Sequence, residues 1–231
     1  MSDTFDARFS RNFEAISKEE QAQLAEKHVA VLGCGGLGGY VVEYLARLGV
    51  GFFTLCDGDV FDQSNLNRQL LSTEDSIGQN KAEAAKARIL DIHKTASVAV
   101  FPENMTDQNA GLILSGCDVA VCALDTVSAR RVLAEAAKTL HIPVVFGAIA
   151  GWCGQVAVMQ PGDNLLDMLY PAGEERGEEM ILGNLSFTAA LCAALQAAET
   201  AKALLARPVG LIRGQLLQFD LLQNTFEEII L

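Results

Sequence analysis

The stretch Val31-Leu32-Gly33-Cys34-Gly35-Gly36-Leu37-Gly38 decides the fold, because it has the pattern of a sharp turn between a buried strand and a helix. Residues 28–32 contain two valines and no turn residue, which favours a short buried strand. Gly33 permits a sharp exit from this strand, and Gly35 and Gly36 let the backbone approach a phosphate because no Cβ intervenes. The helix that follows offers free amides and the positive end of its dipole to an anion. The stretch therefore predicts a phosphate-binding turn.

An acidic residue follows the next strand at the spacing of a nucleotide-binding fold. Asp57 directly follows the apolar run 52–56, about twenty residues after the glycine turn. A carboxylate at this position can bind a ribose hydroxyl. A glycine motif alone is a weak signal, but strand, turn, helix and Asp57 in this order indicate nucleotide binding. The alternative is a tight turn kept only for packing.

Composition favours a large α/β domain that does not bind nucleic acid. Of the 231 residues 50% are hydrophobic, which is enough for a sizeable core. The formal net charge of −12 opposes nucleic-acid binding, since phosphate recognition needs a basic surface. The N-terminus is polar, and the most apolar predicted helix, 187–206, contains Gln196, Glu199 and Lys202. We therefore expect a cytoplasmic protein without a membrane span.

The six cysteines indicate a reducing compartment rather than a metal site, because none of them forms a C-x-x-C pair. Most are expected to be small buried side chains. They are Cys34, Cys56, Cys117, Cys122, Cys153 and Cys192.

Strand and helix patterns alternate up to about residue 147, which predicts a Rossmann-like, doubly wound and mainly parallel sheet. The predicted strands are 28–33, 52–57, 97–101, 118–124 and 143–147, and the predicted helices are 38–48, 80–94, 107–115 and 126–140. A capping box that begins at Ser17 predicts a helix to about Lys27, within an N-terminal helical arm over 1–27.

The pattern changes after Gly151. We expect a strand over 154–160, a crossover loop without secondary structure over about 161–185, and the helix over 187–206. The runs 214–220 and 225–231 predict an antiparallel strand pair at one edge of the sheet. Without a repeat or a linker, residues 1–231 are expected to form a single domain.

A polar cluster follows the second predicted strand. Asn65 and Arg68 lie on a loop just after Asp57, where both could contact phosphate oxygens, and arginine is a forked, permanently charged donor. Lys81 opens a predicted helix, a position that the helix dipole disfavours for a cation unless the side chain reaches an anion. For both cations the alternative is a solvated surface residue.

Asp125 ends the apolar strand at the edge where α/β sheets bind ligands. A carboxylate there can hold Mg²⁺, which usually takes only one or two protein carboxylates together with phosphates. The alternative, compatible with the first, is a cap for the next helix. Arg8 and Arg11, taken alone, are only an N-terminal basic pair.

The order of these motifs resembles the ThiF/MoeB/HesA family, the bacterial relatives of ubiquitin-activating E1 enzymes. The similarity covers nearly the whole chain, and the block at 64–69 together with Lys81 is specific, whereas the glycines alone would not be. The motifs are Arg8-Phe9-Ser10-Arg11, the glycine turn, Asp57-Gly58-Asp59-Val60, Ser64-Asn65-Leu66-Asn67-Arg68-Gln69, Gly78-Gln79-Asn80-Lys81, Asp125, Gly154-Gln155-Val156 and the run from Leu195 to Lys202.

The resemblance implies an ATP-dependent adenylyltransferase. The C-terminal Gly-Gly carboxylate of a small ubiquitin-like sulfur carrier, similar to MoaD or ThiS, would attack the α-phosphate of ATP, and pyrophosphate would leave. The acyl-adenylate would then serve sulfur transfer for molybdenum or tungsten cofactor, thiamine or a related product. Positioned cations would neutralise the charge that develops.

The resemblance also implies roles for individual residues. Arg11 matches an arginine that the family supplies from the other subunit of a homodimer, and Asp125 matches the Mg²⁺ ligand. The implied catalytic residues are Arg11, Arg68, Lys81 and Asp125. The implied ATP-binding residues are Gly33, Gly35, Gly36, Asp57, Asp59, Ser64, Asn65, Arg68, Gln69, Lys81, Asp125 and Thr126.

Three features depart from the family. Many members bind zinc through two C-x-x-C pairs, but Leu165 and Met168 stand at the first pair and the chain ends before the second, so we predict no zinc. No cysteine lies between residues 154 and 191, so we expect the reaction to stop at adenylation, with Cys153 packed rather than covalently active. Thr126 replaces a common asparagine, and its hydroxyl can still donate a hydrogen bond.

Three other functions compete with this interpretation. An NAD-dependent oxidoreductase would explain the glycine turn and Asp57 but would leave Asn65, Arg68, Lys81 and Arg11 without a role. A non-catalytic scaffold is consistent with the missing zinc cysteines, but it would not need to keep the cations. A member that activates a peptide or a small acid would use the same motifs.

Overall fold

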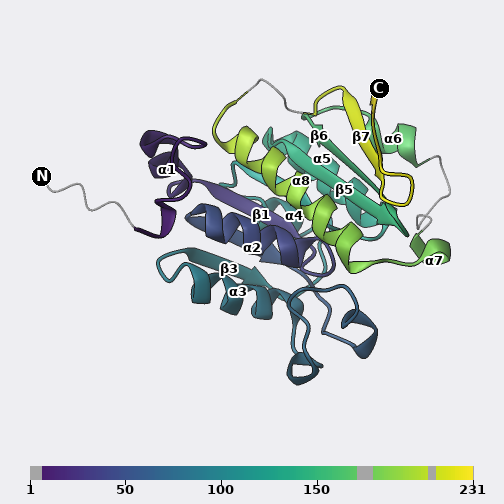
Figure 1. Ribbon diagram of the computed structural model, residues 1–231, viewed down its shortest axis with the longest axis horizontal. Helices are drawn as coiled ribbons and strands as arrows, with labels where there is room; N and C mark the ends of the chain where they lie inside the picture. The colour runs from purple at the N-terminus through teal and green to yellow at the C-terminus, as the bar shows by residue number, and fades with distance from the viewer. Residues whose placement is uncertain (1–6, 171–178, 208–211, 231) are drawn as a thin grey trace, which may run out of the picture.

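The computed structural model describes residues 7–170, 179–207 and 212–230 and contains an eight-stranded sheet (Figure 1). The strand order is β3-β2-β1-β4-β5-β6-β7-β8, in which β1 to β5 are parallel and β6 to β8 pair antiparallel. The strands are β1 (His28–Leu32), β2 (Phe52–Cys56), β3 (Ser97–Phe101), β4 (Val119–Cys122), β5 (Val144–Ala150), β6 (Cys153–Met159), β7 (Gln215–Asp220) and β8 (Thr225–Ile230). The predicted doubly wound sheet with an antiparallel C-terminal pair is therefore confirmed.

Helices cover both faces of the sheet. The helices are α1 (Lys18–Leu24), α2 (Gly38–Leu48), α3 (Lys81–Ile92), α4 (Ala110–Ile113), α5 (Val127–Leu140), α6 (Leu165–Leu169), α7 (Glu179–Leu182) and α8 (Ser186–Leu204). Buried side chains of α2, α3 and α8 form one core with the sheet, and those of α4, α5 and α6 form the other. None of the described helices is both long enough and apolar enough to cross a membrane.

Strand β1 shows why this sequence forms a central strand. Val29 and Val31 point into the core under α2 and α8, whereas Ala30 and Leu32 point into the core under α4 and α5. Successive side chains of a strand face opposite sides, so a strand between two helical layers must be apolar throughout. The apolar run 28–32 could therefore be recognised as a strand although polar and apolar residues do not alternate in it.

The glycine turn places the start of α2 against the end of β1. A Cβ on Gly38 would lie 1.8 Å from the carbonyl oxygen of Gly33, so no side chain fits there. Gly33 itself has a φ of +89°, in the left-handed region that favours glycine. These two residues fix how closely the N-terminus of α2 approaches the edge of the sheet.

The predicted element boundaries agree with the structure to within three residues at each end, except in the crossover segment, residues 161–185. That segment was expected to lack secondary structure, and this was wrong, because it contains α6 and α7. Helix α6 has only five residues, of which Leu165 and Leu166 are buried, so it is too short to show a helical period. The single domain over 1–231 stays a prediction.

We predict that Gly38→Ala lowers the free energy of unfolding by about 1–3 kcal/mol, because the added methyl group would overlap the Gly33 carbonyl. Gly111→Ala is the matched control, since Gly111 lies in α4 with open space around its Cα, and alanine favours a helix. Denaturant unfolding of both variants would measure the difference. An equal stability of the two variants would contradict this packing argument.

Candidate functional site

The candidate site lies where β1, β2 and β4 reach their carboxyl ends at the same edge of the sheet. The glycine turn follows β1, Asp57 follows β2, and Asp125 follows β4 shortly after its last residue. The strands are neighbours in parallel register, with Leu32 paired to both Cys56 and Cys122. The topology therefore brings together three segments that lie far apart in the sequence.

Asp57 ties the glycine turn to the loop after β2. Its carboxylate accepts hydrogen bonds from the backbone amides of Cys34 (2.7 Å) and Asp59 (2.8 Å). Burial raises the pKa of Asp57, although the two amide donors and the nearby Lys81 favour the ionised form. A carboxylate has about four acceptor positions, so Asp57 keeps lone pairs for a further donor such as a ribose hydroxyl.

Lys81 lies at the start of α3 with only 7% of its surface exposed. Its Nζ is 2.9 Å from a carboxylate oxygen of Asp59, so the anion that it reaches in this structure is a protein carboxylate. Its charge also acts on Asp57 and on the thiol of Cys34. The ammonium group is therefore held close to the glycine turn.

Asn80 holds this arrangement together and was not recognised from the sequence. Its Nδ2 donates to the carbonyl oxygens of Asp57 (3.0 Å) and Asp59 (3.1 Å), and its Oδ1 caps α3 by accepting from Ala82 and Glu83. An asparagine directly before a predicted helix is a typical N-cap. That position was the signal that could have identified Asn80.

The loop over 62–69 is ordered by its own side chains. Asp62 accepts from the backbone amide of Ser64 (2.8 Å), and the Oδ1 of Asn65 accepts from the backbone amide of Asp62 (3.1 Å). Asn65 is buried and completes the capping box of a short 3₁₀ helix, Gln63–Asn65, whose N-cap is Asp62. Contact between Asn65 and a phosphate stays a prediction.

Arg68 lies over the glycine turn. A Cβ on Gly36 would be 3.9 Å from the Cγ and Nε of Arg68. The Nη1 of Arg68 donates to the carbonyl oxygen of Ser64 (3.0 Å) and to the Oδ1 of Asn67 (2.9 Å). These contacts use one of its nitrogens, and the guanidinium fork has five N–H donors in total.

Gln69 packs beside Arg68 on the same turn. Its Nε2 would lie 3.3 Å from a Cβ on Gly35, and the residue is 7% exposed. Its Oε1 is buried and has no hydrogen-bond partner among the described residues. The loop therefore closes over both middle glycines of the turn.

Asp125 and Thr126 have separate roles at the end of β4. Thr126 is the N-cap of α5, with its hydroxyl accepting from the amide of Ala129 (3.4 Å). The alternative that Asp125 caps this helix is therefore wrong. Asp125 is exposed, and among the described residues its carboxylate has no hydrogen bond or ion pair.

The cysteines are unsuited to act as nucleophiles where they are buried. Burial raises the pKa of Cys34 and Cys122, that of Cys56 and Cys192 to about 12, and that of Cys117 to about 11. A thiol with such a raised pKa is not ionised at neutral pH and is inert. Cys153 is only partly buried, at the start of β6.

No group of three or more His, Cys, Asp or Glu within the described ranges could hold a metal ion.

Arg11 is not brought to the glycine turn of its own chain. It is exposed on an N-terminal arm that packs at the other end of α2, where Phe9 lies against Gly49 and Gln21 donates to the carbonyl oxygen of Leu48 (2.7 Å) (Figure 1). Helix α2 has 11 residues. At 1.5 Å per residue it separates the arm from the turn by roughly 16 Å.

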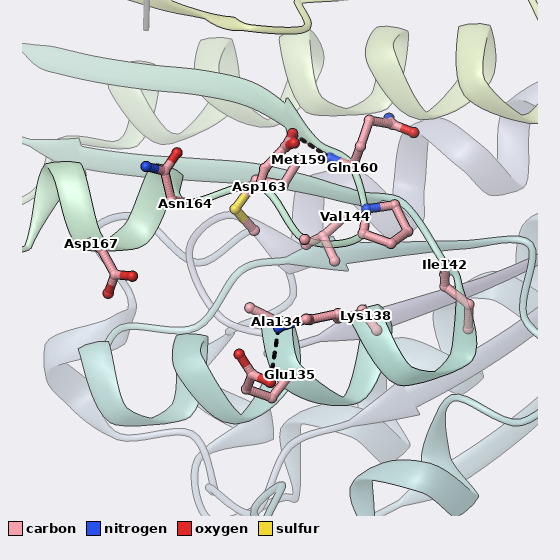
Figure 2. Close-up of a pocket in the computed structure, with 13 residues that line it drawn as sticks. Ala134, Glu135, Lys138, Ile142, Val144, Met159, Gln160, Asp163, Asn164 and Asp167 are labelled. Atoms are coloured by element: carbon pink, nitrogen blue, oxygen red, sulfur yellow. Dashed lines mark hydrogen bonds and ion pairs between the residues drawn. The ribbon is translucent and has the colours of Figure 1, made fainter.

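Two cavities lie away from the candidate site. Figure 2 shows one of about 140 Å³ between α5 and the loop after β6, with Glu135 and Lys138 on one side and Asp163 on the other. It lies beside Val144, the first residue of β5, and its partner Met159. This is the end of the sheet where the parallel strands begin, whereas Asp57 lies where they end. A second cavity, of about 370 Å³, adjoins the first between β6, α6 and the start of β7. Neither cavity is lined by a predicted site residue.

Comparisons with known proteins agree with the motifs. A family model described as the ThiF family matches residues 9–231. The chain is 33% identical to "SAMP-activating enzyme E1" of Haloferax volcanii, covering 96% of this chain and 84% of that protein. It is 34% identical to "Sulfur carrier protein adenylyltransferase" of Thermus thermophilus, covering 93% and 82%. The crystal structure of E. coli MccB with ATP has the same fold, with a TM-score of 0.79 at 22% identity over 97% of this chain and 71% of that one.

The raised pKa of Asp57 makes its contribution to stability depend on pH. The contribution is fully present below the pKa of the unfolded chain and is lost as pH rises through the folded-state pKa. We therefore predict that the stability of Asp57→Asn increases relative to the wild type from about pH 4 to pH 7. Urea unfolding at a series of pH values would measure this difference, with the exposed carboxylate of Asp107 changed to Asn as the charge-matched control. If the stability difference between Asp57→Asn and the wild type did not change with pH, the raised pKa of Asp57 would be contradicted.

Proposed function

The chain belongs to the ThiF family, and on this premise we propose that it is an ATP-dependent adenylyltransferase for a small ubiquitin-like sulfur carrier that ends in Gly-Gly. The observation that carries the proposal is the joint placement of the glycine turn, Asp57, Arg68 and Lys81 at one edge of the sheet. The names of the relatives from Haloferax and Thermus support the same reaction. The motif-based resemblance to this family is confirmed.

We propose that ATP binds along this edge. The ribose hydroxyls would donate to the remaining lone pairs of Asp57, and the phosphates would lie against the glycine turn and the N-terminus of α2. Arg68 has N–H donors free of its two protein contacts, and an ammonium has three donors, so Lys81 can bind a phosphate without leaving Asp59.

The chemical step is attack of a carboxylate oxygen of the carrier terminus on the α-phosphorus. A new phosphorus–oxygen bond forms, the bond from the α-phosphorus to the bridging oxygen breaks, and pyrophosphate leaves with that electron pair. The products are the acyl-adenylate and pyrophosphate. Arg68 and Lys81 would stabilise the negative charge that builds up on the phosphate oxygens.

Asp125 fits the requirements of a Mg²⁺ ligand. Its carboxylate is exposed at the ligand-binding edge and is not used by another described side chain. Mg²⁺ takes few protein carboxylates and completes its shell with phosphate oxygens and water, so one carboxylate is a sufficient donor. When bound, the ion would neutralise part of the triphosphate charge.

We also propose that the protein uses no structural zinc and acts in the cytoplasm.

We propose that the enzyme is a homodimer whose Arg11 completes the site of the partner. The arm that carries Arg11 is anchored about one helix length from the glycine turn of its own chain. A positive side chain that cannot reach its own site can reach the equivalent site of a second copy across a twofold axis. Each dimer would then contain two shared sites.

The first test is transfer of AMP to a carrier. Purified protein with Mg-ATP and a panel of ThiS-like and MoaD-like carriers should give a carrier with AMP on its terminal glycine, detected by intact-protein mass spectrometry. Lys81→Ala should lower the rate by at least about 100-fold, because it removes a positioned charge from the transition state. Lys86→Ala, on the same helix α3, is the matched control and should keep the wild-type rate. An unchanged rate for Lys81→Ala would refute its assignment.

The shared site can be tested with a heterodimer. Arg11→Ala and Lys81→Ala chains, co-expressed with different tags and purified through both, combine one intact site with one doubly damaged site. We predict about half of the wild-type activity for this heterodimer, although each parent variant is inactive. Failure to recover a dimer through both tags, or a heterodimer as inactive as its parents, would overturn the proposal that Arg11 acts on the partner's site.

A further inference from the structure

Arg130 is a buried cation that the adenylation chemistry does not use. It lies on α5 and is 4% exposed, on the helix face that also buries Val127, Leu133 and Ala137. Within the described part of the chain no carboxylate pairs with it. Arginine stays charged at any physiological pH, so its burial costs free energy unless its hydrogen bonds are satisfied.

The guanidinium of Arg130 joins two segments that are distant in sequence. Its Nε donates to the carbonyl oxygen of Leu124 (3.0 Å), the residue before Asp125, and its Nη1 donates to the hydroxyl of Tyr170. It also lies over the rings of Tyr170 (5.1 Å) and Phe146 (5.5 Å), which adds cation–π attraction. Arg130 is thus a buried bridge from the end of β4 to the end of α6.

An apolar side chain would fill the same space at lower cost. Replacing a buried charge by a well-packed hydrophobic residue is often neutral or stabilising, so packing alone does not account for an arginine here. Only a planar guanidinium group holds two hydrogen-bond donors in fixed directions relative to each other. The two acceptors lie next to Asp125 and within the crossover segment, 161–185.

The neighbouring Arg131 supplies a natural control. Its Nη2 donates to the backbone carbonyl of Tyr170 (3.0 Å), and its Nη1 pairs with Asp167. Arg131 therefore fastens α6 to α5 as Arg130 does. Among the described residues, Arg131 makes no hydrogen bond or ion pair with β4 or with Leu124. The two arginines therefore share the attachment to α6, and only Arg130 is also attached to the end of β4.

We propose that Arg130 is a positioning residue that fixes Asp125 relative to Tyr170, so that α6 and the end of the site that carries Asp125 are held in one geometry. The role of Asp125 as a Mg²⁺ ligand rests on the proposed function. The link between the two segments rests on the contacts of Arg130 alone. It is therefore testable whether or not the protein adenylates a carrier.

Hydrogen exchange tests the link directly. In Arg130→Lys, which keeps the charge but loses the fork, we expect faster amide exchange both in the peptide over 119–126 and in the peptide over 165–170. Tyr170→Phe removes only the hydroxyl and should show a smaller effect of the same kind. Arg131→Lys should affect 165–170 alone. Unchanged exchange over 119–126 in both Arg130→Lys and Tyr170→Phe would overturn the proposal.

The Mg²⁺ dependence of ATP–pyrophosphate exchange tests the consequence for the site. Residues that orient a metal ligand through one intermediate group typically contribute 10–100-fold to metal affinity, so Arg130→Lys should raise the half-saturating Mg²⁺ concentration roughly ten-fold. Arg131→Lys should leave that concentration unchanged, even if it lowers the melting temperature. An equal Mg²⁺ dependence of the Arg130→Lys and wild-type enzymes would show a purely structural role and refute positioning. Altered hydrogen exchange in the Arg130→Lys variant, together with a wild-type protein that never responds to Mg-ATP, would instead support the link and refute the adenylation proposal.

Discussion

The carboxylate of Asp57 is the interaction on which the candidate site depends. It accepts a hydrogen bond from one backbone amide of the glycine turn and from one of its own loop, so the two segments share a single partly buried acceptor. Burial of this carboxylate costs free energy, as its raised pKa shows, and Lys81 and the amide donors offset part of that cost. Asn80 then holds the backbone of the same loop from the start of α3. A structural carboxylate that keeps spare lone pairs at a ligand edge is what a ribose-binding residue requires.

The fold could be predicted from the sequence because its central strands are buried on both faces. Apolar runs such as 28–32 and 119–122 stand out from the helices between them, and the glycines mark where β1 ends. Helix α6 could not be predicted, since five residues with two buried leucines show no period. The direction of the C-terminal strands followed from the short turn between the last two apolar runs.

The residues of the site could be named from their motifs, but their partners could not. The pairing of Lys81 with Asp59 depends on how the start of α3 folds against the loop after β2. The bridge from Arg130 to Tyr170 joins residues forty positions apart, which no local pattern reveals. An arginine on the apolar face of α5 was the one local sign of it. Sequence therefore indicates which groups are present, and the sheet edge decides which of them meet.

The claim that this edge exposes the α-phosphate of ATP to a carrier carboxylate is tested most directly by an oxygen label. A Gly-Gly carrier with ¹⁸O in its terminal carboxylate would be incubated with the enzyme and Mg-ATP, and the adenylate would then be cleaved at its acyl carbon by a thiol. Attack on the α-phosphorus predicts AMP that carries one ¹⁸O atom from the carrier. Release of ADP, or of AMP without the label, would contradict the account.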